Sequence, residues 1–366
     1  MKPYRLIALA GTIAALAACS NSPTVLTPQP KSTATPTAPP PPIGSLGSYQ
    51  TLATIGSTVD PGPGAGAGDQ NPYGLAIATA TAGLEVKGDL LVCNFNDAKN
   101  VQGAGTTIVQ LSPTPGSTPT RFAQSSSFAG CDAIAMAPNG NLWLADYTAN
   151  NDPIVAPAGT INTTLAQNTW YGPWGEAFNT GTASMPTFFE TNAKNGTVTR
   201  IHIAPGPTFS FDTLLSGLSY NNGMPGNILA PAGLTYDKAT DSLYVVDSNA
   251  NRVLKIAQAT TAPASSYATS AMGFTSPNVS VVYSGAPLSA PISSALLANG
   301  HLVVGNTGDN NLVEIDPALG SIVSTKLVDT GAAGAIFGIA TTTATDGTQY
   351  VYFNNDNTNT VVRLSP

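Results

Sequence analysis

The chain has 366 residues, of which 42% are hydrophobic and only 9% are charged. Its formal net charge is −7 and it contains 13 Lys and Arg residues in all, which excludes a surface built to neutralise nucleic-acid phosphates. The 36 Gly and 30 Pro residues predict many turns and short elements, as in a large all-β domain.

Residues 1–18 are predicted to be a lipoprotein signal peptide. Lys2 and Arg5 form a positive start, and the apolar stretch 6–18 is too short to span a bilayer as a stable helix. The stretch ends in Leu-Ala-Ala-Cys, which resembles a bacterial lipobox. That resemblance implies that Cys19 becomes the mature N-terminus and carries acyl chains such as palmitate. The alternative is an ordinary secretory signal in which the cysteine is incidental.

Residue 20 is Ser, where an inner-membrane retention signal usually has Asp. The resemblance therefore implies a lipid-anchored protein of the outer membrane, in the bacterial cell envelope. Residues 19–47 are rich in Pro and Thr and have no apolar period. Such a segment cannot bury enough surface to offset its ordering entropy, so we expect an extended tether. The folded domain is then residues 48–366.

Six similar units follow one another from residue 49 onward. Each unit contains a short apolar strand, a polar turn, a second strand that ends in Asp or Asn, and an Asn-rich turn into a third strand. Fourth strands are predicted near residues 120, 163, 210, 280 and 323. The sixth unit ends before a fourth strand, and the strand predicted at 48–56 would complete it beside 360–364. These features predict an all-β, six-bladed β-propeller closed by an N-terminal outer strand.

The second strands end in an amide or a carboxylate in every unit. A ligand site needs such groups in one or a few blades, whereas a structural position is filled in all of them. We interpret the column as caps of the turns that follow. Its members are Asn94, Asp146, Asn192, Asp247, Asn306 and Asn355.

The units GCDAIAMAPNGNLWLAD and PAGLTYDKATDSLYVVDSNANRVLKI resemble those of NHL-repeat and gluconolactonase-like six-bladed propellers. The resemblance implies cation ligands at the middle of the Pro-x-Gly that opens each unit. Here that position holds Tyr, Cys, Trp, Ala, Ile and Phe, none of which is a hard-cation ligand. Asp132 and Glu176 lie close by, and would hold a divalent cation such as Ca²⁺ only with the help of water. The alternative is that both are solvated or bonded to neighbouring turns.

Histidine offers no catalytic arrangement. His202 lies within a predicted strand and His301 follows a turn on the opposite face, so neither spacing suggests a Ser-His-Asp or Cys-His site. The catalytic histidine that virginiamycin-lyase-like propellers carry has no clear match. We predict no catalytic residue.

Aromatic residues gather on the face where the first strands begin, which we call the mouth. Rings beside amide side chains suit a neutral polar ligand, such as a glycan or a peptide, or a protein partner. The alternative is that the rings plug the central channel. The predicted ligand-binding residues are Tyr73, Trp170, Tyr171, Trp174, Tyr220, Asn222 and Phe337.

Cys93 ends a second strand and Cys131 begins the next first strand, so both lie on the mouth side of neighbouring blades. An oxidising envelope would allow a disulfide between them, the alternative being two buried thiols. Taken together, the sequence predicts a non-catalytic envelope lipoprotein that binds a ligand or partner at its mouth, without a cofactor. The alternative is a metal-dependent hydrolase or lactonase that uses Asp132 and Glu176.

Overall fold

The computed structural model describes residues 45–167, 170–179, 186–206, 208–224, 226–268 and 273–366. All of them belong to one compact unit of residues 40–366. Cys19, the predicted signal peptide and the tether up to residue 44 lie outside the described residues. No helix in the described ranges has the length and apolar character needed to cross a membrane. The helices within these described ranges are three short 3₁₀ turns, η1 (Leu46–Ser48), η2 (Ser126–Phe128) and η3 (Ser248–Ala250).

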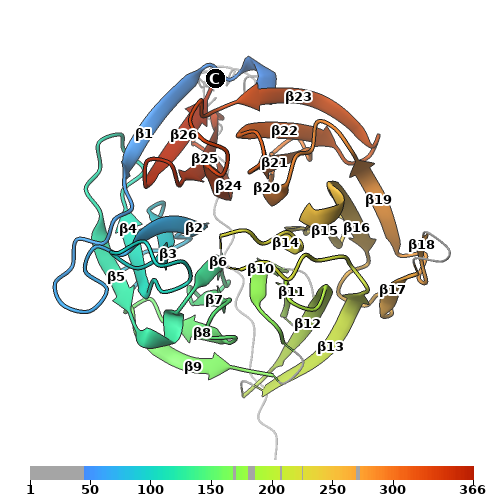
Figure 1. Ribbon diagram of the computed structural model, residues 1–366, viewed down its shortest axis with the longest axis horizontal. Coiled ribbons are helices and arrows are strands. Elements are labelled where there is room, and N and C mark those ends of the chain that lie inside the picture. Colours follow the sequence, from blue (N-terminus) through green and yellow to red (C-terminus); the bar gives the residue numbers. More distant parts are fainter. Residues whose placement is uncertain (1–44, 168–169, 180–185, 207, 225, 269–272) are drawn as a thin grey trace, which may run out of the picture. The chain divides into compact units, whose positions relative to one another are not determined.

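Six antiparallel sheets form the blades of a six-bladed β-propeller (Figure 1). Their innermost strands contact one another in the closed order β2, β6, β10, β14, β20, β24 and back to β2, which confirms the sheet count expected from the repeats. The first three blades are made of β2 (Gln70–Ile77), β3 (Leu90–Asn96), β4 (Thr107–Leu111) and β5 (Thr120–Gln124); β6 (Cys131–Met136), β7 (Leu142–Asp146), β8 (Asp152–Val155) and β9 (Ile161–Leu165); and β10 (Pro173–Phe178), β11 (Thr187–Asn192), β12 (Thr197–Ala204) and β13 (Thr208–Ser216).

The other three blades repeat this order of strands, from the channel to the rim. Every fourth strand expected from the sequence is present. The blades are made of β14 (Pro231–Asp237), β15 (Ser242–Asp247), β16 (Arg252–Ala257) and β19 (Val279–Ser284); β20 (Pro291–Leu296), β21 (Leu302–Asn306), β22 (Asn311–Asp316) and β23 (Ser321–Leu327); and β24 (Ile336–Thr343), β25 (Gln349–Asn355), β26 (Thr360–Ser365) and β1 (Thr51–Ser57).

The two ends of the domain meet in blade six. Strand β1 pairs antiparallel with β26 from Thr51↔Ser365 to Ser57↔Thr360, which confirms the predicted closure (Figure 1). The attachment extends beyond the predicted strand, because Leu46 is buried and its backbone N–H donates to a carboxylate oxygen of Glu314 at 2.6 Å. Closure therefore combines strand pairing with a buried anchor on blade five.

A short hairpin in the connection from β16 to β19 was not predicted from the sequence. It consists of β17 (Ser265–Ala268) and β18 (Gly273–Phe274), and β17 pairs in parallel with the end of β13. The Arg200 guanidinium of blade three donates to the carbonyl oxygens of Ala259 and Ala262 in the same connection, both at 2.9 Å. Blade four thus extends the outer edge of blade three.

The blades pack face to face through their second strands. Strands β3, β7, β11, β15 and β21 are buried along their whole length, because a strand between two neighbouring sheets is covered on both faces. The outermost strands are more open, and four of the five residues of β9 are exposed. The innermost strands surround the central channel, and the first residues of these strands lie at its mouth.

Asparagine side chains join neighbouring blades at the mouth. In four turns between a second and a third strand, an Asn with positive φ accepts a hydrogen bond through its Oδ1 from a backbone N–H of the next blade. Only Gly, Asn and Asp adopt this left-handed backbone readily. The pairs are Asn150 with Gly172, Asn251 with Ala290, Asn310 with Ala335, and Asn359 with Asn71, at 2.7 to 3.0 Å.

Candidate functional site

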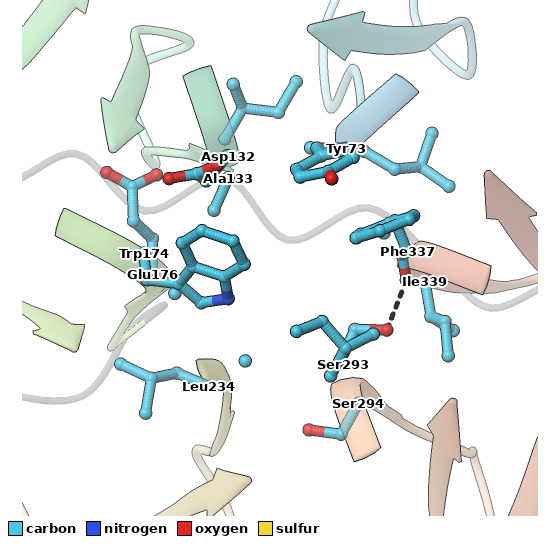
Figure 2. Close-up of a pocket in the computed structure, with 17 residues that line it drawn as sticks. Tyr73, Asp132, Ala133, Trp174, Glu176, Leu234, Ser293, Ser294, Phe337 and Ile339 are labelled. Atoms are coloured by element: carbon cyan, nitrogen blue, oxygen red, sulfur yellow. Dashed lines mark hydrogen bonds between the residues drawn. The ribbon is translucent and has the colours of Figure 1, made fainter. Parts of the chain in front are cut away.

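The channel is crossed by a cluster of aromatic rings near its mouth. Tyr73 stacks on Phe337 with ring centroids 3.7 Å apart and on Phe95 at 4.3 Å. Trp174 meets Tyr73 edge-on at 6.1 Å and Tyr147 at 5.5 Å. The edge-to-face contacts of Trp174 are of a kind that aromatic rings favour. The rings therefore form a packed partition, and Figure 2 shows Tyr73, Trp174 and Phe337 around its centre.

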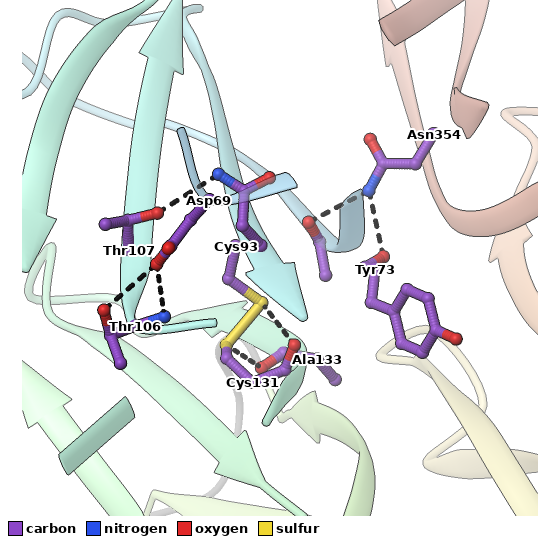
Figure 3. Close-up of a disulfide and its surroundings, with 10 residues drawn as sticks. Asp69, Tyr73, Cys93, Thr106, Thr107, Cys131, Ala133 and Asn354 are labelled. Carbon is purple, nitrogen blue, oxygen red and sulfur yellow. Dashed lines mark hydrogen bonds between the residues drawn. A yellow bond between two sulfur atoms is a disulfide. The ribbon is translucent and has the colours of Figure 1, made fainter. Parts of the chain in front are cut away.

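Tyr73 is held in place through its backbone. The Asn354 amide of blade six donates to the carbonyl oxygens of Tyr73 and Gly74 at 2.9 and 3.0 Å (Figure 3). Next to it, Cys93 and Cys131 form a disulfide between blades one and two, with their Cα atoms 6.0 Å apart. Both neighbours of blade one are thus fixed to it at the level of the ring partition.

On the outer side of the rings is an open pocket of about 290 Å³, which we call the mouth pocket. Tyr73, Trp174 and Phe337 form part of its wall. Loop residues on either side contribute backbone groups and small side chains, and no lining residue is charged. Its lining is Tyr73, Trp174, Gly226, Asn227, Ile228, Leu229, Ala290, Ile292, Thr307, Ala333, Gly334 and Phe337.

On the inner side of the same rings is a smaller cavity of about 90 Å³, which we call the inner cavity. The innermost strands of all six blades line it. Asp132 and Glu176 line it, and Figure 2 shows both carboxyl groups at the same wall. Because Tyr73 and Trp174 line both spaces, the ring partition separates a neutral outer pocket from an acidic inner one.

Three more carboxyl groups are buried behind Asp132 and Glu176, between blades two and three. Glu176 and Glu190 are cross-strand partners in blade three, and Asp146 and Asp152 belong to blade two. All five side chains are at most 8% exposed, and none of their oxygens has a hydrogen-bond partner of normal geometry. We call these five groups the acid cluster. A cluster of this kind is too costly to bury fully ionised, so it must hold protons or a cation.

The pKa values follow from this burial. Burial raises the pKa of Asp132, Asp146, Asp152 and Glu176 well above their ordinary range. Repulsion by neighbouring carboxylates adds to the effect, from Glu190 on Asp152 and on Glu176. Burial raises the pKa of Glu190 to about 7, although the polar groups of Asp152 and Asn192 beside it oppose that rise. Burial thus favours the protonated, uncharged form of each member of the cluster.

The cluster does not form a ready metal site. Among the residues that the structure describes, no group of three or more His, Cys, Asp or Glu side chains is placed to hold a metal ion. Asp132 and Glu176 alone offer two carboxylates, and Ca²⁺ takes six to eight oxygen ligands. A cation in the inner cavity would depend mainly on water and on the nearby hydroxyl groups of Ser293 and Ser294.

The predicted aromatic face is only partly assembled. Trp170 is 1% exposed and packs on Phe211 between blades two and three, 5.5 Å between ring centroids, so its ring lines neither the mouth pocket nor the inner cavity. Tyr171 and Tyr220 are exposed and line neither space. Asn222 lines a separate pocket beside the mouth. Of the seven predicted residues, Tyr73, Trp174 and Phe337 come together.

The Asp and Asn side chains that end the second strands make three kinds of contact. In four blades the side chain bonds to the loop that precedes the innermost strand of its own blade. Asp247 makes no capping hydrogen bond to the turn that follows and pairs with Arg252 at 2.7 Å, while Asp146 belongs to the acid cluster. The four bonds are Asn94 to Thr58 O, Tyr171 N to Asn192, Asn306 to Pro287 O and Asn355 to Asp329, at 2.8 to 3.0 Å.

The two histidines lie within networks of charged groups away from the channel. His202 Nε2 is 3.2 Å from an oxygen of Asp212, which also pairs with Arg200. His301 Nδ1 is 2.7 Å from Glu314, the carboxylate that holds Leu46. Neither side chain lines the inner cavity or the mouth pocket.

Sequence reasoning missed two rings and three acids of this site. Phe95 directly follows Asn94, and Tyr147 directly follows Asp146. Their position in the repeat, just after the end of a second strand, is the signal that puts both rings at the mouth. Asp146, Asp152 and Glu190 lie in or beside apolar strands, where a carboxylate is unusual. That contrast was the available signal for a buried acidic group.

Comparison with known proteins supports the fold. No family model and no curated protein sequence matches the chain. A gluconolactonase from Xanthomonas campestris is 10% identical with a TM-score of 0.57, over 86% of this chain and 89% of that one. A virginiamycin B lyase from Staphylococcus aureus is 12% identical with a TM-score of 0.53, over 86% and 99%. A luciferin-regenerating enzyme is 12% identical with a TM-score of 0.50, over 86% and 95%. The resemblance to gluconolactonase-like propellers is thus confirmed at the level of the fold.

Proposed function

We propose that the protein is an envelope lipoprotein whose propeller binds an uncharged ring, such as a sugar or an aromatic group, in the mouth pocket. The observation that carries the proposal is the pocket itself, which has about 290 Å³ of space, three aromatic side chains in its wall and no charged lining residue. Binding sites for small molecules combine apolar walls with a few polar groups that fix orientation. Asn227, Thr307 and exposed backbone of the loops supply those groups here.

The proposed role is binding rather than catalysis. A general base or nucleophile must reach the reacting atoms, and the mouth pocket has no carboxylate, imidazole, amine or thiol among its lining residues. The carboxyl groups of Asp132 and Glu176 lie on the other side of the ring partition. Anchoring through Cys19 would keep such a receptor in the envelope.

The first experiment blocks the pocket without disturbing the core. Ala333 is exposed and lines the mouth pocket, whereas Ala332 is exposed and does not. Saturation-transfer NMR with N-acetyl-L-tyrosinamide and with neutral trisaccharides should show binding to the wild type and to Ala332→Trp. Binding should be lost in Ala333→Trp. Equal binding by both variants, or no binding of any neutral probe at millimolar concentration, contradicts the proposal.

Anchoring is tested separately. Full-length protein expressed in a bacterium should incorporate labelled palmitate and partition into detergent, and the Cys19→Ala variant should do neither. Label in the variant, or its absence from the wild type, rules out the lipid anchor and leaves the mouth pocket unaffected.

A second candidate function is a metal-dependent hydrolase or lactonase. The observation in its favour is that the carboxylate oxygens of Asp132 and Glu176 have no hydrogen-bond partner in the inner cavity. These two residues would hold the cation, which when bound would polarise a substrate carbonyl. This candidate requires metal in the purified protein and a melting temperature that rises with Ca²⁺ and falls with chelator. Metal-free protein that ignores both additions rejects it.

A further inference from the structure

A second pocket opens on the mouth side, next to the mouth pocket. It has a volume of about 380 Å³ and is lined by Tyr147, Thr148, Lys194, Asn222, Gly223 and Met224. The ring of Tyr147 lies edge-on against Trp174 of the mouth pocket, 5.5 Å between centroids. Met224 and the two residues before it line this second pocket, and Gly226 and the three residues after it line the mouth pocket. One ligand of modest length can therefore occupy the two pockets together.

Lys194 gives this second pocket a positive charge. Its side chain is half-buried, with Nζ 3.8 Å from the centroid of the Tyr147 ring and donating to the backbone oxygen of Tyr147 at 3.2 Å. It forms no ion pair with the described residues, and these include every Asp and Glu of the chain. Burial lowers its pKa, and the charge of Asp132 opposes that effect.

An unpaired, half-buried ammonium is unusual in so acidic a chain. The net charge is −7, yet no residue lining the two mouth-side pockets is acidic and only Lys194 is basic. Desolvation of a charge is costly without a counter-charge. The ring and the carbonyl hold the ammonium in one position, and its remaining N–H donors are available to a partner.

We propose that the Lys194 pocket is an anion subsite, and that the ligand carries a carboxylate beside the uncharged ring held in the mouth pocket. This inference rests on the proposed function and specifies its ligand class. A single cation matches a single negative charge, whereas a phosphate dianion would meet one lysine in a negatively charged protein. The side chains of Thr148 and Asn222 add a hydroxyl and an amide to the same wall.

The test compares two probes that differ only in charge, N-acetyl-L-tyrosine and N-acetyl-L-tyrosinamide. A hydrogen bond to a charged group is stronger than one between neutral groups, so the wild type should bind the acid at least roughly tenfold more tightly than the amide, which corresponds to about 1.4 kcal/mol. Lys194→Met should lose that preference while keeping its affinity for the amide. Lys194→Arg should retain most of it, since the positive charge remains.

Lys255→Met is the matched control. Lys255 is also half-buried and lies over a tyrosine ring, 5.9 Å from the centroid of Tyr244, but lines neither pocket. This variant should keep the wild-type preference. A thermal melt of each variant checks that the fold is unchanged.

The outcomes separate the subsite from the proposed function. If the wild type binds acid and amide equally and Ala333→Trp abolishes both, the anion subsite is wrong and the mouth pocket stands. If the preference for the acid survives in Lys194→Met, the assignment to Lys194 is wrong. Tighter binding of N-acetyl-phosphotyrosine than of either probe overturns the carboxylate in favour of phosphate. No binding of any probe overturns both proposals.

Discussion

Replacing Glu190 by Gln should make the protein less sensitive to alkaline pH. Glu190 is fully buried in β11, opposite Glu176 and close to Asp152. Burial raises its pKa from the ordinary 4.5 to about 7, so the folded protein binds a proton that the unfolded chain releases. The stability associated with that proton is complete below pH 4.5 and is lost as the pH rises through 7. Gln has nearly the same shape and never ionises.

The size of the effect follows from the shift. A rise from 4.5 to about 7 corresponds to about 3 kcal/mol of unfolding free energy, which is a large part of the stability of a typical domain. The other members of the cluster, Asp132, Asp146, Asp152 and Glu176, have pKa values raised further. Glu190→Gln leaves these four groups in place, so the difference in slope between the variant and the wild type reports on Glu190.

The free energy of unfolding is measured by urea titration, followed by circular dichroism, at several pH values between about 4.5 and 7.5. The wild type should lose stability across the interval, and Glu190→Gln should lose about 3 kcal/mol less. Asp309→Asn is the control, because Asp309 is exposed and Asn can still accept the hydrogen bond that Asn311 N donates. A wild-type pH slope in a natively folded Glu190→Gln protein would refute the protonated acid cluster.

Three further predictions concern closure, the disulfide and the ring partition. Ile55 of β1 is fully buried, so Ile55→Ala should lower the free energy of unfolding in urea by about 2–5 kcal/mol. Leu52 is exposed on the same strand, so Leu52→Ala should change that free energy by less than about 0.5 kcal/mol. Unreduced, denatured protein should show no free thiol at Cys93 or Cys131, and two reactive thiols would contradict the disulfide. Reduction should lower the free energy of unfolding by about 4 kcal/mol, because the disulfide closes a 38-residue loop. Asn354→Leu removes the donor of the hydrogen bonds to the carbonyl oxygens of Tyr73 and Gly74, and it should lower the free energy of unfolding by about 1–3 kcal/mol. An unchanged urea midpoint would show that Asn354 does not stabilise the ring partition.

The fold was predictable because its determinants repeat. Each blade carries the same order of short strands and turns, so six imperfect copies reinforce one another, and the strand before the first copy was the natural complement of the incomplete sixth. The β17–β18 hairpin and the Leu46 anchor were not predictable in this way. Each occurs once, and each is fixed by partners distant in sequence, β13 and Glu314.

The site was predictable in its location and less so in its packing. Alignment of the repeats placed Tyr73, Trp174 and Phe337 at equivalent positions, and they meet in space. Trp170 is only four residues before Trp174, but its ring packs against blade three at Phe211 instead of at the mouth. Loop residues lack the alternation that fixes which way a strand side chain points. The acid cluster combines residues of two neighbouring blades. The repeat pattern within one blade does not predict which side chains of the next blade it will contact.

The pairing of the first strand with the last strand in one sheet also makes strand exchange between neighbouring molecules possible. Until β1 docks, β26 presents an unpaired edge whose sequence is identical on every copy of the chain. A β1 from one copy that pairs with β26 of another would satisfy the same hydrogen bonds, and a series of such exchanges would link propellers into domain-swapped strings. The pairing of each β1 with its own β26 therefore closes one ring and also covers the edge through which two copies could exchange strands.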